Sequence, residues 1–222
     1  MGERYMKRGK IAILGGTGAL GSGLARRLAT AGWHVLIGSR DAVRAGEFAA
    51  SLGASNIQGT SFAEAAEQSD LAILTVPFAS QSDVIAAVAS HLAGKVLIDA
   101  TVPLKPPKVS MVQLPEAGSA AAYAVRAAGA EVRVVSAFQN VSAQLLQDDD
   151  EIDCDVLVTG DDAEARDMTI AVVRDCGLRG WHAGPLANSV AAEALTSLLI
   201  FMNRTYKSGH AGIRITGLEP HE

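Results

Sequence analysis

The chain has 222 residues, of which 49% are hydrophobic and 19% are charged, so it can bury a full-sized core and does not have the composition of a disordered protein. Its 19 Lys and Arg residues and 24 Asp and Glu residues give a formal net charge of -5, which argues against duplex DNA or an anionic membrane as the main partner. The two cysteines are isolated from each other, so we expect neither a disulfide framework nor a metal site.

The hydrophobic runs give no sign of export or membrane insertion. The first ten residues include several charged side chains, and the apolar run at 11–14 is much shorter than the core of a signal peptide. The longest apolar run, at 190–202, is interrupted by Glu193 and falls short of the roughly 20 residues that span a bilayer. We expect a soluble, cytoplasmic protein.

Short β-branched or leucine-rich runs alternate with helix-forming runs, which is typical of an α/β protein with a parallel sheet. We expect strands at residues 11–14, 34–37, 56–59, 71–76, 95–99 and 132–137. We expect the intervening helices at residues 22–30, 42–52, 62–68, 82–92 and 119–128. Four prolines between residues 101 and 115 predict an extended loop there.

The last third of the chain continues the α/β pattern. We expect a strand at 155–159, a helix at 163–176 and a long apolar helix at 188–206, with the acidic run at 148–151 in a solvated loop. The apolar helix has the pattern of a helix buried on more than one side, as at a domain or subunit interface, and it predicts a homodimer. The fold class is therefore α/β, a Rossmann-type doubly wound parallel sheet at residues 1–145 followed by a small C-terminal α/β domain at 146–222.

A glycine motif lies between the first expected strand and the first expected helix, where Gly16, Gly18 and Gly21 have the spacing G-x-G-x-x-G. In this position the glycines allow a tight turn, the approach of a pyrophosphate to the backbone, and close packing of helix on strand. Backbone N–H groups at the helix start then face the phosphates. The motif predicts a dinucleotide site.

The residues after the second strand indicate which dinucleotide is bound. A site specific for NAD has Asp or Glu there, whereas this sequence has Ser39 and Arg40, with Arg44 one helical turn further on. Guanidinium groups suit a 2'-phosphate because they form bidentate, charge-assisted hydrogen bonds. The sequence therefore predicts NADP, and we interpret Asp41 as a helix cap.

The sequence contains no Tyr-x-x-x-Lys pair, since none of its tyrosines, Tyr5, Tyr123 and Tyr206, is followed by lysine four residues later. Such a pair supplies the proton in short-chain dehydrogenases. An enzyme without it transfers hydride to an acceptor that does much of its own chemistry, and a flavin-like acceptor fits.

Several segments together resemble the NADPH-dependent coenzyme F420 reductases, also called F420:NADP oxidoreductases. They are residues 15–21, 38–40, 75–77, 99–104, 134–138, 183–186 and 212–218, in this order along nearly the whole chain. The resemblance implies a deazaflavin ring held against the nicotinamide in a cleft between two domains, with hydride passing directly from one to the other.

The resemblance also implies site residues. The donor, NADP, is expected to contact Gly16, Thr17, Gly18, Ala19, Leu20, Gly21, Ser39, Arg40, Arg44, Thr75, Val76, Pro77 and Ala100. The acceptor, coenzyme F420, is expected to contact Ser136, Ala137, Gln139, Asn140, Val141, Gly217 and Leu218. Candidate cations for its anionic tail are Arg204, Lys207 and Arg214.

One departure from the family pattern concerns the acceptor, because Gln139 stands where many members have histidine. An amide can hydrogen-bond a ring carbonyl, but it cannot act toward it as a cation. Two alternatives therefore stay open: an NADPH-dependent reductase of the same fold with an imine, another flavin or a pterin as acceptor, and a non-catalytic NADP sensor.

Overall fold

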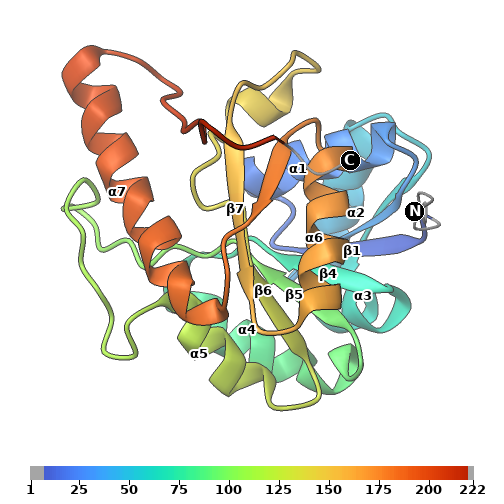
Figure 1. Cartoon of the computed structure of the whole chain (residues 1–222). Helices are drawn as coiled ribbons and strands as arrows, with labels where there is room; N and C mark the ends of the chain where they lie inside the picture. The colour runs from blue at the N-terminus through green and yellow to red at the C-terminus, as the bar shows by residue number, and fades with distance from the viewer. Residues whose placement is uncertain (1–7, 220–222) are drawn as a thin grey trace.

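The computed structural model describes residues 8–219 as an α/β fold built on one eight-stranded sheet (Figure 1). The strand order in the sheet is β3-β2-β1-β4-β5-β6-β7-β8. The strands are β1 (Lys10–Leu14), β2 (His34–Ser39), β3 (Ile57–Ser61), β4 (Leu71–Leu74), β5 (Val96–Asp99), β6 (Arg133–Ser136), β7 (Asp155–Gly160) and β8 (Arg179–His182). All neighbouring strands are parallel except β6 and β7, which are antiparallel.

Helices cover both faces of the sheet. They are α1 (Ala19–Thr30), α2 (Ala42–Ser51), α3 (Phe62–Gln68), α4 (Phe78–Val88), α5 (Ala120–Ala128), α6 (Ala163–Asp175) and α7 (Ser189–Tyr206), with short 3-10 helices η1 (Ala89–Leu92), η2 (Leu145–Gln147) and η3 (Leu186–Asn188). Apolar side chains of α1, α2 and α6 form one core on the sheet, and those of α3, α4 and α5 form the core on its other face. This is the layering of a doubly wound fold.

The central strand β1 shows why the sheet is parallel and buried. Ile11 and Ile13 point into one core, Ala12 and Leu14 into the other, and all four residues have no exposed surface. A strand covered on both faces needs such a continuous apolar run, rather than alternating polar residues. The α/β fold class expected from the sequence is therefore confirmed.

Several element boundaries differ from expectation, and three of them lie beside the expected dinucleotide site. Helix α1 begins at Ala19 rather than at residue 22, because the N–H of Ser22 already bonds to the carbonyl of Gly18, at 2.8 Å. Strand β4 ends at Leu74 rather than at residue 76, and α4 begins at Phe78 rather than at residue 82. Proline at 77 explains both, because it ends a strand and is well tolerated at the start of a helix.

Strand β8 is an element that the sequence pattern does not predict. It has four residues, one of them glycine, and its side chains are only partly buried. Such a short edge strand lacks the apolar run that marks the central strands. Its main-chain pairing with β7, in register from Asp155 with Arg179 to Val158 with His182, is what defines it.

Strand β7 pairs with β6 only through its last residues, Thr159 opposite Ser136 and Gly160 opposite Val135. Since the two strands are antiparallel, the start of β7 extends beyond the carboxyl end of β6. Asp155 lies four residues before Thr159, which corresponds to about 13 Å along an extended strand. The start of β7 therefore lies at the edge of the sheet where the parallel strands end.

Within a single chain helix α7 is buried on one side only, and burial of its other side at a subunit interface stays a prediction. Ala192 and Leu199 face the protein, whereas Leu198, Phe201 and Tyr206 are exposed. The stretch Leu186–Tyr206 is long and apolar enough to cross a membrane, and 33% of its most apolar part is buried in the protein. One such helix is weak evidence for a membrane span. The buried Glu193 in this stretch is costly inside a bilayer.

The buried guanidinium of Arg27 joins α1 to the segment that leads to β7. It donates hydrogen bonds to the carbonyl oxygens of Leu145, Asp148 and Asp150, and to that of Cys176 at the end of α6. These hydrogen bonds cross the proposed domain boundary at residue 145, because Arg27 precedes it and the carbonyl groups lie at or after it. The division into two domains stays a prediction.

Candidate dinucleotide and acceptor site

The glycine motif forms a tight turn between β1 and α1. The N–H of Gly16 bonds to the carbonyl of Ile13 at 3.1 Å, and the N–H of Gly18 bonds to that of Gly15 at 3.0 Å. Thr17 and Ala19 are exposed on this turn, and Leu20 is half-buried. The turn thus presents its backbone to solvent at the carboxyl edge of β1.

Two glycines in this turn are required by close packing on the end of β4. Gly15 has φ +94°, and a Cβ there would lie 2.8 Å from Val76 Cγ1. A Cβ on Gly21 would lie 2.6 Å from the Cα of Gly16 and 2.7 Å from Thr75 Oγ1. The turn therefore meets the end of β4, the strand on the other side of β1 from β2, which is the switch point where doubly wound folds bind ligands.

The first turn of α1 has unsatisfied backbone donors. Its N-cap is Gly18, which supplies no side-chain cap, and no acidic residue lies in the first turn. The N–H groups of Ala19, Leu20 and Gly21 precede the first helical hydrogen bond. With the positive end of the helix dipole they form an anion site that fits a pyrophosphate.

The residues after β2 provide the expected cations. Arg40 and Arg44 are both exposed, and within residues 8–219 neither forms an ion pair. Asp41 caps α2, since its Oδ1 accepts the N–H of Arg44 at 3.1 Å, and this confirms the capping interpretation. The hydroxyl of Ser39 accepts the N–H of Asp41 at 3.3 Å and remains free to donate. This set fits a 2'-phosphate.

The residues expected beside the nicotinamide lie where β4 and β5 end. Val76 is buried and Pro77 is exposed, at the start of α4. Ala100 follows β5, and its N–H bonds to the carbonyl of Leu74 at 3.1 Å. These residues and the glycine turn are therefore brought to one edge of the sheet.

The residues expected at the acceptor follow β6, and in this chain they are buried. Ser136 and Ala137 have no exposed surface, while Gln139 and Asn140 are at most 5% exposed. Between them, Phe138 adopts φ +73°, a strained conformation for a bulky residue. This backbone conformation turns the chain sharply after β6.

Gln139 joins the ends of two strands. Its Nε2 donates to the carbonyl oxygen of Asp99 and to the hydroxyl of Ser136, both at 2.8 Å, and the hydroxyl of Thr196 in α7 donates to its backbone carbonyl at 2.7 Å. Its Oε1 is buried and has no hydrogen-bond partner among the described residues. This oxygen is an acceptor suited to a ligand N–H group.

Two buried carboxyl groups behind this edge were missed by the sequence reasoning. Asp99 accepts a hydrogen bond from Gln81 Nε2 at 2.6 Å, and burial raises its pKa to about 6. Glu193 of α7 accepts the N–H groups of Ala120 and Ala121 at the start of α5, at 2.6 and 3.0 Å. Burial raises the pKa of Glu193 to about 7, and the charge of Asp99 adds to that rise.

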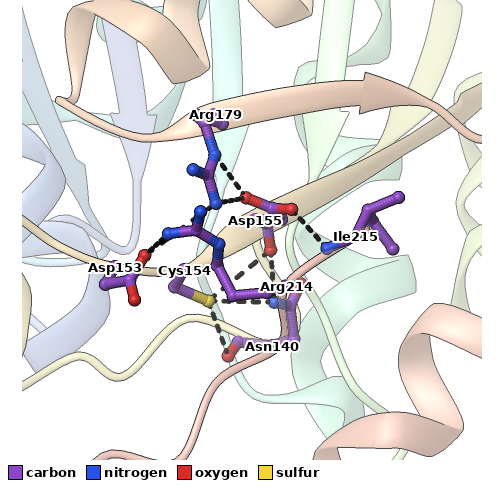
Figure 2. A network of polar contacts seen from close by, with 7 residues as sticks. All are labelled: Asn140, Asp153, Cys154, Asp155, Arg179, Arg214 and Ile215. Atoms are coloured by element: carbon purple, nitrogen blue, oxygen red, sulfur yellow. Dashed lines mark hydrogen bonds and ion pairs between the residues drawn. The ribbon is translucent and has the colours of Figure 1, made fainter. Parts of the chain in front are cut away.

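Asn140 connects the loop after β6 to the start of β7. Its Nδ2 donates to the backbone carbonyl of Asp155 at 2.7 Å, and Cys154 Sγ lies 3.3 Å away (Figure 2). The carboxylate of Asp155 in turn accepts the N–H of Ile215 at 2.6 Å. The structure thus links the loop at 136–141 to the tail that carries Gly217 and Leu218, both of which are exposed.

The candidate cations for an anionic tail have different surroundings. Arg214 forms an ion pair with Asp153 (Figure 2), and Arg204 donates to the hydroxyl of Ser110 at 3.3 Å. Lys207 ends α7 in the left-handed conformation and is exposed. Within residues 8–219 no group of three or more His, Cys, Asp or Glu residues could hold a metal ion.

The sheet order, the glycine turn at the switch point and the exposed arginines after β2 together define a nucleotide-binding oxidoreductase fold of the Rossmann type. Residues 10–103 match the family model described as NADP oxidoreductase coenzyme F420-dependent. The chain is 42% identical to the F420-dependent NADP reductase of Methanothermobacter marburgensis, with 94% of this chain and 99% of the relative aligned.

Two further comparisons agree with this match. The F420-dependent NADP reductase of Methanocaldococcus jannaschii is 40% identical, with 95% of this chain and 99% of the relative aligned. The crystal structure of a protein from Arthrobacter sp. FB24, described as an F420-dependent NADP-reductase, superposes with a TM-score of 0.80 at 25% identity, covering 93% of this chain and 98% of that chain. The chain belongs to the family of F420-dependent NADP reductases.

Proposed function

We propose that the chain transfers a hydride between NADPH and the deazaflavin coenzyme F420. The observation that carries the donor assignment is the glycine turn at the switch point, followed after β2 by Arg40 and Arg44, which form no ion pair within the described residues. The near full-length similarity to F420-dependent NADP reductases supports the acceptor. The buried, unpartnered Oε1 of Gln139 is consistent with an acceptor that presents a ring N–H group.

The work of the protein in this reaction is to bind, orient and exclude water. NADPH supplies the hydride at nicotinamide C4 and the deazaflavin takes it up at C5, with a proton from solvent completing the two-electron reduction. The first turn of α1 would hold the pyrophosphate, and Arg40 with Arg44 the 2'-phosphate. Val76, Pro77 and Ala100 would then fix the nicotinamide beside the loop after β6, so that the reacting carbons are held in contact.

The test is the visible absorbance of oxidised F420 mixed with the purified protein and either NADPH or NADH. Bleaching with NADPH and little or none with NADH is the expected result. Tight NADPH binding without bleaching would exclude F420 and direct the search to imines, flavins and pterins. NADPH binding with no oxidation by any of these acceptors would favour a non-catalytic sensor.

The exposed apolar side of α7 supports a homodimer. Its residues are joined by exposed apolar side chains in the proline-containing loop before α5, and together they are Met111, Val112, Leu114, Leu198, Phe201, Met202 and Tyr206. A patch of this kind on a small protein marks an interaction surface. A monomeric mass by light scattering would contradict the homodimer.

The remaining assignments concern partners, location and domains. The net charge of -5 supports small-molecule cofactors rather than nucleic acid or an anionic membrane as partners, and the two isolated cysteines support a location in the reducing cytoplasm. Residues 1–145 would carry the donor site, and residues 146–222 would complete the acceptor pocket. Sedimentation of the activity with membranes after cell fractionation would contradict the location.

A further inference from the structure

The segment that follows α7 returns across the start of β7 (Figure 1). It is mostly exposed, and only Ala211, Ile213 and Ile215 are half-buried. So little apolar burial cannot order a chain segment alone, because fixing each residue costs about 1–2 kcal/mol in backbone entropy. Polar contacts therefore decide where this tail lies.

Asp155 makes two of these contacts, one through its backbone N–H and one through its carboxylate, and Figure 2 shows the second. Its N–H donates to the carbonyl of Ile213 at 2.9 Å, and its Oδ2 accepts the N–H of Ile215 at 2.6 Å. Its Oδ1 accepts hydrogen bonds from Arg179 of β8, with Nε at 2.7 Å. Its backbone carbonyl accepts the amide of Asn140.

One fully buried residue thus joins four parts of the chain: β7, β8, the loop after β6, and the tail. The geometry places this junction at the carboxyl edge of the parallel strands, because β7 starts beyond the end of β6. Ligands of doubly wound folds bind at that edge. The junction therefore lies on the side of the sheet where the acceptor is expected.

The bond at Ile215 is the last one toward the end of the described chain. Within residues 8–219, no hydrogen bond or ion pair is formed by Thr216, Gly217, Leu218 or Glu219. The upstream contacts, Ala211 N–H to Asn203 Oδ1 at 2.8 Å and the exposed pair of Arg214 with Asp153, hold other points of the tail. The position of Gly217 thus depends on the bond between Ile215 and Asp155.

We infer that Asp155 is a positioning residue for the acceptor: its carboxylate holds the N–H of Ile215, and through it sets the position of Gly217 and Leu218. This inference rests on the proposed function. Arg179 has a supporting part, because its guanidinium donates to Oδ1 of the carboxylate and so orients Oδ2 toward the tail. The donor site is expected at the glycine turn and at the ends of β2, β4 and β5, so we expect NADPH binding not to depend on this bond.

The test compares Ile215→Pro with Ile215→Ala. Both variants remove the isoleucine side chain, but only proline also removes the N–H that Asp155 accepts. Because the proline variant cannot form this hydrogen bond to a charged group, we expect it to raise the KM for F420 roughly tenfold over Ile215→Ala. The KM for NADPH should stay within about twofold in both variants, which shows that the rest of the site is intact.

A second readout does not use the enzymatic activity. The backbone N–H of Asp155 donates to Ile213, so hydrogen exchange at this amide reports whether the tail is docked. It should be faster in Ile215→Pro than in Ile215→Ala. Asp155→Asn, which removes the charge shared by Ile215 and Arg179, should raise the KM for F420 in the same direction.

Three outcomes would overturn the inference. Equal KM values for F420 in the proline and alanine variants would show that the bond does not position the acceptor. An equal rise in KM for NADPH and F420 would show a general structural defect instead. A wild-type chain that does not reduce F420 would overturn the proposed function as well, so the two failures are distinguishable.

Discussion

The side-chain amide of Gln139 donates a hydrogen bond of 2.8 Å to the backbone carbonyl of Asp99 and so ties the carboxyl ends of β6 and β5 together. The same nitrogen donates to Ser136 at an equal distance. Gln139 therefore links the loop after β6 to the end of β5, next to Ala100, one of the residues expected to contact NADP.

Gln139→Leu tests this link. The substitution removes two buried hydrogen bonds, of which the carbonyl of Asp99 keeps a second donor in the N–H of Ala137, whereas the hydroxyl of Ser136 loses the donor it accepts, at a cost of about 1–3 kcal/mol in the free energy of unfolding. We expect kcat/KM for F420 to fall at least roughly tenfold, with the Kd for NADPH changed less than about twofold. Urea unfolding and steady-state kinetics measure the two effects, and Gln58→Leu at an exposed position of β3 is the control. A normal kcat/KM for F420 would show that Gln139 does not act on the acceptor.

Arg40→Asp tests the dinucleotide preference. Replacing an unpaired guanidinium by a carboxylate removes a charge-assisted bond to the 2'-phosphate and adds repulsion. We expect kcat/KM for NADPH to fall about 100-fold while that for NADH changes little. Arg126→Asp, the same charge change on the exposed side of α5, should affect neither. Equal losses with both dinucleotides would place Arg40 away from the 2'-phosphate.

Gly21→Ala tests the close packing of the glycine turn. The new Cβ would lie 2.6 Å from the backbone of Gly16, so the turn must open and its N–H groups must shift. We expect NADPH binding, measured by calorimetry, to weaken at least roughly tenfold. Gly46→Ala in α2 is the matched control, since the nearest atom to its Cβ is 4.0 Å away and a helical alanine is favoured. Unchanged binding in Gly21→Ala would contradict the site.

The buried carboxyl groups predict a pH dependence of stability. The pKa of Asp99 is raised to about 6 and that of Glu193 to about 7, so the folded chain binds protons more tightly than the unfolded chain. The free energy of unfolding should therefore decrease as the pH rises from about 4 to about 7. Stability from this source is greatest in acid and is lost above the raised pKa values.

Between about pH 4 and pH 7, the free energy of unfolding of Glu193→Gln should fall by roughly 2–3 kcal/mol less than that of the wild type, because one of the two groups no longer titrates. The amide keeps an acceptor for the start of α5. Urea unfolding at pH 4.5, 6 and 8 measures the effect, with Glu47→Gln at an exposed position of α2 as control. A decrease as large as that of the wild type would rule out Glu193 as its source.

The sequence was sufficient for the donor side because its signals are local. Gly16, Gly18 and Gly21 lie between a strand and a helix, and Arg40 follows the next strand, so both the turn and its ligand preference follow from neighbouring residues. The capping role of Asp41 is likewise a contact across three residues. Such contacts are fixed by chain geometry before any tertiary packing.

The acceptor side could not be predicted in the same way because its contacts are distant in sequence. Asp155 meets Ile215 across 60 residues, and Glu193 meets Ala120 across 73. The antiparallel direction of β7 brings the first pair together, and no pattern in residues 155–160 indicates that direction. Strand β8 was also missed, because its side chains are only partly buried and it is defined by its pairing with β7, a separate segment of the chain.

The guanidinium of Arg27, which precedes residue 145 in the chain, bonds to the carbonyl groups of Leu145 and Asp150 and to that of Cys176 at the end of α6. A hinge at this boundary would leave the buried guanidinium without several of its acceptors, at a cost comparable to a large part of a domain's stability. We therefore expect the enzyme to meet its two substrates in a cleft of nearly constant width. The shape of this preformed cleft would then select among the ring systems of possible acceptors. A closing movement of the protein would not limit the rate of turnover.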